Sequence, residues 1–314
     1  MPPLSGMRGG LGIGSASPLF SMHPIFILGP TGCGKSRLAV ELAEALGNAE
    51  IVSADAYQVY RQLPILTAAP GAELRKRALH HLISIMDVTE NNDAAVHARR
   101  AIAAIEDIEA RGRRAIVTGG SGLYVKFISH GISPAPPSDP TLRAELDALP
   151  AEEAVARLQA LDPEGAARTN LQNPRYVRRN LEIVILGGKP LAYWQQNWQK
   201  PPAGPGFLLT RDTAELDARI ARRAHKMISA GLVNEVAALG TLSATAAKTL
   251  GLSLVRSHLA GELTLPQMLD ALALTTRQYA KRQRTWLRRE TWLQPINMND
   301  TAVHEILRRM NERE

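Results

Sequence analysis

The sequence predicts an α/β fold, in which a parallel sheet is interrupted by a helical insertion and followed by a helical C-terminal part. Three observations predict it. Short apolar runs alternate with amphipathic patterns before residue 133. Two Pro-rich connectors then enclose a polar helical stretch, and residues 213–240 and 244–289 are mainly of helical pattern. The predicted division is a core of residues 23–132 and 207–314 with an insertion of residues 133–206.

The first elements are a strand, a turn and a helix. Residues 24–28 form a continuous apolar run, which is typical of a buried parallel strand. A Gly-rich turn at 29–34 follows, and the helix after it ends at Gly47. Strands that alternate with helices predict a parallel sheet with right-handed crossovers. The further elements of this alternation are predicted at 50–53, 93–111, 114–118 and 207–209.

The composition narrows the class of protein. The chain has 314 residues, of which 45% are hydrophobic and 21% charged, and this suits a globular protein with a full core. The formal net charge of +7 is modest for the length of the chain, so the distribution of the charge matters more than its total. A single cysteine excludes a disulfide framework and indicates a reducing compartment. No apolar run is long enough to span a bilayer, so we expect a cytoplasmic monomer with no membrane partner.

The first 22 residues are treated separately from the fold. Residues 1–22 are rich in Gly, Ser and Pro, and they lack a charged segment that leads into a long apolar one. A secretory signal is therefore not expected. We predict that residues 1–22 are a disordered leader.

A phosphate-binding motif follows the first predicted strand. It fits G-x-x-x-x-G-K-[ST], a P-loop pattern in which backbone N–H groups and the start of the next helix surround an anion. Lysine adds a point charge, and the final hydroxyl can bind Mg²⁺, which makes Ser36 the candidate metal ligand. Cys33 is interpreted as a small filler residue. The candidate diphosphate- or nucleotide-binding residues are Gly29, Pro30, Thr31, Gly32, Cys33, Gly34, Lys35 and Ser36.

Asp55 follows the second predicted strand. The carboxyl ends of parallel strands face the ligand crevice, so this carboxylate is a candidate general base beside the bound phosphates. Capping of the following turn is the alternative, and the sequence does not decide between them. Gln58 could contact substrate or pack, and Tyr57 could stack on a base or pack. Ser121 lies in a Gly-rich turn that follows another buried strand and should reach the same crevice.

The sequence has three basic clusters; the first is a candidate polyanion contact, and the second could instead form a surface ion pair with Asp217. Near the C-terminus, Arg277, Lys281, Arg284 and Arg288 recur on one helix face, beside a second stripe of Tyr279, Gln283 and Trp286. Few acidic residues neutralise this face, which favours a phosphate backbone over a merely solvated helix. The second cluster consists of Arg219, Arg222 and Arg223, and one of these arginines could clamp developing charge in the phosphate site. The third cluster consists of Arg175, Arg178 and Arg179.

Together these motifs resemble one family, the tRNA dimethylallyltransferases. Its pattern runs G-P-T-x-x-G-K-[ST], D-S-M-Q-V-Y, H-H-L, G-G-T-G-L-Y, R-A-L-E and T-R-Q-x-A-K-R-Q-x-T-W-L-R. The collinear counterparts here begin at Gly29, Asp55, His80, Gly119, Arg179 and Thr276 and cover roughly residues 25–290. The resemblance implies transfer of a dimethylallyl group from dimethylallyl diphosphate to N6 of the adenosine 3′ of the anticodon, at position 37, in tRNAs that read codons starting with U.

The resemblance also implies roles for single residues. Asp55 occupies the position of the family's general base. Arg223, Thr31, Lys35 and Ser36 occupy the positions of the groups that bind and neutralise the diphosphate together with Mg²⁺. The P-loop then holds a leaving group rather than ATP. The insertion is expected to grip the anticodon stem-loop. The residues implied in tRNA binding are Asp55, Ala56, Tyr57, Gln58, Ser121, Arg175, Arg178, Arg179, Arg277, Lys281 and Arg284.

The chain departs from the family pattern at several positions, and other functions compete. Ala56 stands where the family usually has Ser, Tyr57 where it has Met, and Ser121 where it has Thr. Tyr176 stands where an Arg is frequent, and Leu250-Gly251-Leu252 replaces I-G-Y.

A small-molecule kinase that uses ATP and Mg²⁺ is the first alternative. A transferase that acts on free adenine nucleotides is the second, and a nonenzymatic RNA-binding P-loop protein is the third.

Overall fold

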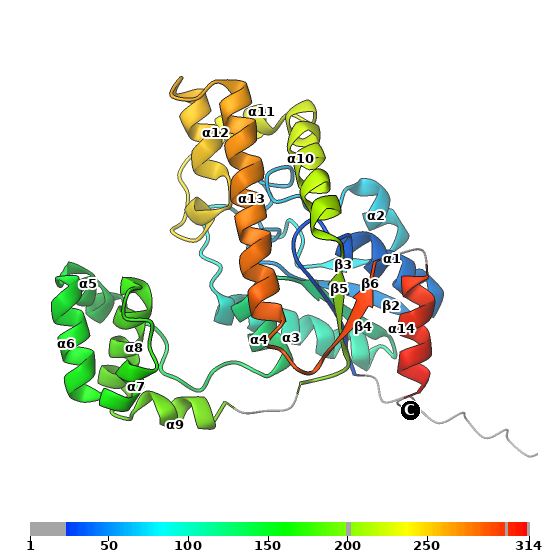
Figure 1. The fold of residues 1–314 in the computed structure, drawn as a ribbon. Helices are drawn as coiled ribbons and strands as arrows, with labels where there is room; N and C mark the ends of the chain where they lie inside the picture. Colours follow the sequence, from blue (N-terminus) through cyan, green and yellow to red (C-terminus); the bar gives the residue numbers. More distant parts are fainter. Residues whose placement is uncertain (1–22, 199–201, 299–300, 313–314) are drawn as a thin grey trace, which may run out of the picture.

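The computed structural model describes residues 23–198, 202–298 and 301–312, so the predicted leader lies outside the described residues. A six-stranded parallel sheet forms its centre, in the order β3-β2-β4-β1-β5-β6 (Figure 1). The topological switch point lies at β1, where open α/β sheets bind their ligands. The strands are β1 (Ile25–Leu28), β2 (Ala49–Ala54), β3 (His80–His81), β4 (Arg114–Gly119), β5 (Gly206–Thr210) and β6 (Leu293–Asn297).

Alternate residues of β1 supply the two faces of the sheet. Ile25 and Ile27 belong to one buried cluster, with side chains of α1 (Lys35–Leu46) and α14 (Ala302–Asn311). Phe26 and Leu28 belong to another, with side chains of α3 (Ala94–Ala110) and α4 (Gly122–Ser129). All four β1 side chains are fully buried. Helices therefore cover both faces, which explains why β1 is a continuous apolar run.

The ends of the core helices follow local signals that the sequence carries. Gly47 ends α1 in the left-handed conformation, with φ 73°, as predicted. Asp93 begins α3, because its carboxylate accepts hydrogen bonds from the N–H groups of Ala95 and Val96 at 2.8 Å each. The strands predicted at 50–53, 114–118 and 207–209 are confirmed as parts of β2, β4 and β5.

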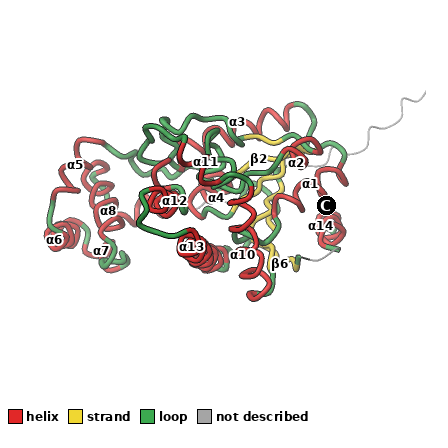
Figure 2. Tube along the Cα trace, turned by 90° about the horizontal axis from the view of Figure 1, so that it is seen from above, coloured by secondary structure: helices red, strands yellow, loops and turns green. Residues whose placement is uncertain are grey.

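The inserted helices pack around a cluster of their own. Leu158 and Leu181 are fully buried in it. Glu182, also fully buried, accepts hydrogen bonds from Ser138 and Arg179, which ties the start of the insertion to its main helix. The group lies at one end of the molecule, away from the sheet (Figure 2). Its helices are α5 (Pro140–Ala148), α6 (Ala151–Leu161), α7 (Pro163–Ala167), α8 (Pro174–Gly187) and α9 (Leu191–Gln196).

The C-terminal part is helical, with two elements that the sequence did not predict. Strand β6 was missed; it carries Pro295 and lies at the sheet edge, where a missing N–H is tolerated. Helix α14 was also missed. None of the helices within the described ranges has the length and apolar character needed to cross a bilayer. The remaining helices are α2 (Ala72–Arg77), α10 (Thr213–Ser229), α11 (Leu232–Ala237), a 3₁₀ turn (Ala246–Lys248), α12 (Leu252–Leu259) and α13 (Leu265–Leu287).

Candidate active site

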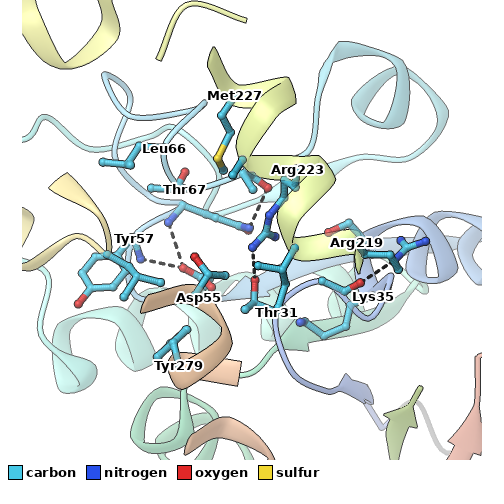
Figure 3. Close-up of a pocket in the computed structure, with 18 of the residues that line it drawn as sticks. Thr31, Lys35, Asp55, Tyr57, Leu66, Thr67, Arg219, Arg223, Met227 and Tyr279 are labelled. Carbon is cyan, nitrogen blue, oxygen red and sulfur yellow. Dashed lines mark hydrogen bonds between the residues drawn. The ribbon is translucent and has the colours of Figure 1, made fainter. Parts of the chain in front are cut away.

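A pocket of about 390 Å³ opens at the carboxyl ends of the central strands (Figure 3). The P-loop lines one side of it, helix α10 another and helix α13 a third. Asp55, directly after β2, lies between them, as Figure 3 shows. The structure therefore brings together residues that the sequence predicted from three separate segments. The predicted site residues among those that line the pocket are Thr31, Gly32, Gly34, Lys35, Ser36, Asp55, Tyr57, Gln58 and Arg223.

The P-loop owes its shape to two glycines. Gly32 and Gly34 have φ values of 86° and 108°, which side chains other than glycine rarely adopt. Cys33 is fully buried under the loop, and a Cβ at Gly29 would come within 2.8 Å of its Sγ. This packing fits the prediction that the cysteine is a filler. Lys35 Nζ donates a hydrogen bond of 2.9 Å to the carbonyl of Pro30, so its charge stays at the loop.

Two arginines of α10 contact the P-loop. Arg223 donates a hydrogen bond of 3.0 Å to Thr31 Oγ1, and Arg219 donates one of 2.8 Å to the carbonyl of Gly32. Burial lowers the pKa of the Arg223 guanidinium, while the nearby Asp55 carboxylate acts in the opposite direction. With Lys35, these groups give the polar side of the pocket a strong positive potential. Such a cradle suits a diphosphate.

Asp55 caps the turn after β2 and also lines the pocket. Its Oδ1 accepts hydrogen bonds from the N–H groups of Tyr57 at 2.9 Å and Gln58 at 3.3 Å, which closes the turn after β2. The same residue lines the pocket beside the phosphate cradle. Capping therefore fixes the carboxylate in place without removing it from the site.

The residues after Asp55 differ in their surroundings. Ala56 is buried. Gln58 lines the pocket, while its amide accepts a hydrogen bond of 3.2 Å from Ser53 Oγ and donates one of 3.4 Å to the Ala68 carbonyl. Burial raises the pKa of the Tyr57 hydroxyl, whereas the charge of Arg175 from the insertion opposes that shift. Arg175 therefore lies near enough to act on the pocket.

Helix α13 turns its aromatic stripe toward the site. The side-chain oxygen of Gln283, which is buried, accepts a hydrogen bond of 2.7 Å from the N–H of Thr31. The Tyr279 and Ser121 hydroxyls are hydrogen-bonded at 3.1 Å, which places Ser121 just behind the pocket wall. Trp286 packs on Gly122, where a Cβ would come within 2.8 Å of the indole. Sequence reasoning found this stripe but not its contact with the P-loop.

The basic face of α13 points away from the pocket. Lys281 is exposed, and Arg277 is partly exposed. Arg284 donates a hydrogen bond of 2.9 Å to Thr213 Oγ1. These three predicted tRNA contacts lie outside the cavity that holds Asp55, on the helix that forms its wall.

The three arginines of the insertion have different surroundings. Arg178 donates a hydrogen bond of 3.0 Å to the Leu149 carbonyl, and Arg179 binds Glu182 at 2.6 Å, so both brace the insertion. Arg175 is exposed, and next to it the Tyr176 side chain is 57% exposed. Among these residues, the first turn of α8 is therefore the part available to a partner.

An apolar wall, which the sequence analysis did not predict, completes the pocket. It faces the phosphate cradle across Asp55, with Leu66 and Met227 on the opposite side from Thr31 in Figure 3. Three threonines also line it, but each donates its hydroxyl proton to a carbonyl at 2.7 Å within its own helix or turn. The wall is formed chiefly by Leu66, Met227, Leu250 and Leu272, with Thr67, Thr249 and Thr276.

The chain is similar to proteins of known name. A family model described as IPP transferase matches residues 58–290. A tRNA dimethylallyltransferase of Akkermansia muciniphila is 59% identical over 272 residues, which cover 87% of this chain and 92% of that protein. The tRNA dimethylallyltransferase 1 of Citrifermentans bemidjiense is 42% identical over 282 residues, which cover 86% of this chain and 91% of that protein.

Solved structures agree with these relatives. The tRNA isopentenylpyrophosphate transferase of Bacillus halodurans has a TM-score of 0.69 at 32% identity and covers 93% of this chain and 96% of that chain. A eukaryotic dimethylallyltransferase acting on tRNA shares the fold, with a TM-score of 0.77 at 23% identity, over 89% of this chain and 75% of that chain. The chain therefore belongs to the IPP transferase family, the family of the tRNA dimethylallyltransferases.

Proposed function

We propose that the protein transfers a dimethylallyl group from dimethylallyl diphosphate to N6 of the adenosine 3′ of the anticodon, at position 37, in tRNAs that read codons starting with U. The named relatives support this reaction class. The single observation that carries it is a pocket in which a P-loop, an apolar wall and Asp55 meet. These three parts match the diphosphate, the allyl group and the amine proton of the reaction. We further propose that the protein acts as a cytoplasmic monomer.

The proposed step exchanges one bond to carbon for another. The lone pair of adenine N6 attacks C1 of the allyl group, and the C1–O bond breaks with its electrons leaving on the diphosphate. Asp55 takes the proton that N6 loses. Lys35 and Arg223 stabilise the negative charge that develops on the leaving group, with Thr31 held beside them by Arg223. The apolar wall keeps water from the electron-poor allyl carbon.

Magnesium fits the donor set of this site. Ser36 is the second residue of α1 and lines the pocket. Mg²⁺ commonly binds one or two protein oxygens together with substrate phosphates and water. Within the described ranges, no group of three or more His, Cys, Asp or Glu side chains could hold a metal ion. We therefore propose Ser36 as the protein ligand. The ion would neutralise the diphosphate as it leaves.

The proposed nucleic-acid partner is the anticodon stem-loop of tRNA. The basic face of α13 with Arg277, Lys281 and Arg284 would bind backbone phosphates, and Arg175 at the first turn of α8 would approach from the insertion. A base inside a stack cannot reach a carboxylate at the bottom of a cavity, so the target adenine would leave the stack and enter beside Tyr57.

The test is transfer of label. Purified protein is incubated with Mg²⁺, radiolabelled dimethylallyl diphosphate and an anticodon stem-loop with adenosine 3′ of the anticodon. Label on that adenosine is the expected result. The Asp55→Asn variant keeps an oxygen that can cap the turn, so it should bind both substrates while its kcat falls by about 10²- to 10⁴-fold. Asp93→Asn, at the start of α3, is the matched control and should retain kcat.

Other outcomes would replace the proposal. Transfer to free AMP but not to the stem-loop would make the protein a nucleotide-specific transferase. Thermal protection by ATP but not by dimethylallyl diphosphate would favour a small-molecule kinase, because a ligand stabilises the folded state that binds it. Full turnover by Asp55→Asn would remove Asp55 as the base.

A further inference from the structure

Two fully buried polar side chains lie beneath Asp55. His97, on α3, is hydrogen-bonded through Nε2 to the carbonyl of Ser53 at 2.8 Å. Asn92, just before α3, donates from Nδ2 to the carbonyl of Ala56 at 3.2 Å. One of these carbonyls precedes Asp55 by two residues and the other follows it by one. The two side chains therefore hold the backbone on both sides of the candidate base.

The protonation of His97 follows from its partners. A carbonyl can only accept, so Nε2 carries the proton that is donated to Ser53. Nδ1 faces the Asn92 amide nitrogen at 3.3 Å and accepts from it. The ring is therefore neutral, and burial lowers the pKa of His97, which keeps it so. A neutral ring fixes the direction of both hydrogen bonds.

Asn92 is itself held from two further sides. Its N–H donates a hydrogen bond of 2.8 Å to Thr245 Oγ1, and its carbonyl accepts one of 2.6 Å from the Tyr124 hydroxyl. The Tyr124 ring packs edge-on against the His97 ring, with centroids 5.2 Å apart. The network thus connects the turn that holds Asp55 to α3, to α4 and to the segment before α12.

This network has a cost that packing alone does not explain. Asn92 Oδ1 is buried and has no hydrogen-bond partner. A buried polar group without a partner destabilises a fold, but an apolar side chain here would leave the Ala56 carbonyl and His97 Nδ1 without their donor. The amide nitrogen, by contrast, faces both the Ala56 carbonyl and His97. What this arrangement accomplishes is a fixed position of the Ala56 carbonyl and of the turn that contains it.

We propose that His97 and Asn92 are positioning residues that fix the Asp55 turn, and with it the direction of the Asp55 carboxylate toward the substrate amine. The proposal rests on the proposed function, in which Asp55 takes the N6 proton. Because Asp55 Oδ1 is tied to the N–H groups of its own turn, the carboxylate moves with that turn. Displacement of a reacting group by about 1 Å can cost on the order of 100-fold in rate.

The test compares two substitutions at one position. His97→Phe keeps a ring of similar size but loses the donor to Ser53, whereas His97→Gln keeps an N–H donor at similar reach. Transfer to the stem-loop should show a kcat lowered by about 10- to 100-fold for His97→Phe, with KM for both substrates within about twofold of the unchanged protein. His97→Gln should recover most of kcat. His258→Phe, on α12, is the matched control and should leave kcat unchanged.

A second position guards against loss of folding. Asn92→Asp keeps the shape of the side chain but removes the donor to the Ala56 carbonyl, so it should lower kcat as His97→Phe does. Thermal unfolding, and its shift on addition of dimethylallyl diphosphate, check that each variant is folded. Equal kcat for folded His97→Phe and the unchanged protein overturns the inference alone, as does an equal loss for His97→Phe and His97→Gln. Absence of transfer by the unchanged protein overturns the proposed function as well, because Asp55 then has no such proton to take.

Discussion

The side-chain oxygen of Gln283 accepts a hydrogen bond of 2.7 Å from the backbone N–H of Thr31, 252 residues earlier in the chain. This contact joins helix α13 directly to the P-loop. The opposite face of the same helix carries Lys281, an exposed member of its basic stripe. The proposed diphosphate site and the proposed RNA surface therefore lie against opposite faces of helix α13.

Replacement of Gln283 by Leu should weaken binding of dimethylallyl diphosphate. The variant removes the acceptor and leaves the Thr31 N–H without its partner, which costs about 1–3 kcal/mol at a buried site. When this free energy is lost from the diphosphate-bound form of the P-loop, the Kd for dimethylallyl diphosphate rises by about 5- to 150-fold. Calorimetric titration with the diphosphate measures it. Gln278→Leu, on the exposed face of the same helix, should keep the affinity, and an unchanged Kd for Gln283→Leu would contradict the prediction.

The sequence predicted those parts of the site that rest on local signals. The glycines of the P-loop and the strand end at Asp55 each act within a few residues of themselves. The Gln283–Thr31 contact and the apolar wall depend instead on which distant helices pack together. Periodicity shows that a residue such as Leu272 is buried, but not that it faces a cavity.

The edge of the sheet shows the same limit. Strand β6 contains Pro295 and was missed, because a proline argues against a strand unless its position at the edge is known. The two-residue strand β3 was missed because it is too short for an alternation to be visible. In both cases the neighbouring strand, rather than the segment itself, determines the structure.

Replacement of Leu272 by Ala should widen the range of allyl diphosphates. Leu272 is 4% exposed and lines the apolar wall, and a Cβ at Gly251 behind it would lie 2.4 Å from its Cδ1. Its side chain therefore closes the pocket against the backbone of Gly251. The variant should raise kcat/KM for the C10 geranyl diphosphate relative to the C5 substrate by about 10-fold or more.

The same substitution has a predictable cost in stability. Removal of a buried leucine side chain destabilises a fold by about 2–5 kcal/mol, so the assay belongs at low temperature with folding checked by thermal unfolding. Leu274→Ala, on the same helix but 50% exposed, is the matched control and should change neither selectivity nor stability much. A C10-to-C5 ratio that stays at the value of the unchanged protein would show that Leu272 does not limit chain length.

Glu50 should make the free energy of unfolding depend on pH in the acidic range. Its carboxylate is completely buried and binds Arg111 at 2.6 and 2.9 Å and His81 at 2.7 Å. The hydrogen bonds from Arg111, above all, lower the pKa of Glu50 to about 2. Because this pKa lies below the ordinary glutamate value of 4.5, the stabilisation is complete above pH 4.5 and is lost as pH falls toward 2.

Comparison with Glu50→Gln isolates this contribution. At neutral pH the variant should lose about 1–3 kcal/mol of unfolding free energy, because it removes the charge that Arg111 and His81 bind, while Arg111 keeps its ion pair with Asp107. The difference from the unchanged protein should shrink between pH 4.5 and 2, as measured by urea unfolding. Glu153→Gln, in an exposed pair on α6, should change little. A difference that stays constant down to pH 3 would show that Glu50 is not the titrating group.

Lys281 should contribute to RNA binding mainly through counterion release. Its side chain is exposed on α13, on the face away from the pocket, so its loss should leave the diphosphate site intact. Each phosphate contact contributes about 0.7–0.9 to the slope of log Kd against log salt, so Lys281→Ala should flatten that slope by about one contact. Arg308→Ala, on α14, which lies apart from α13 in Figure 1, should keep the slope. An equal slope for Lys281→Ala and the unchanged protein would place the RNA on another surface, and kcat at saturating stem-loop should remain unchanged in either case.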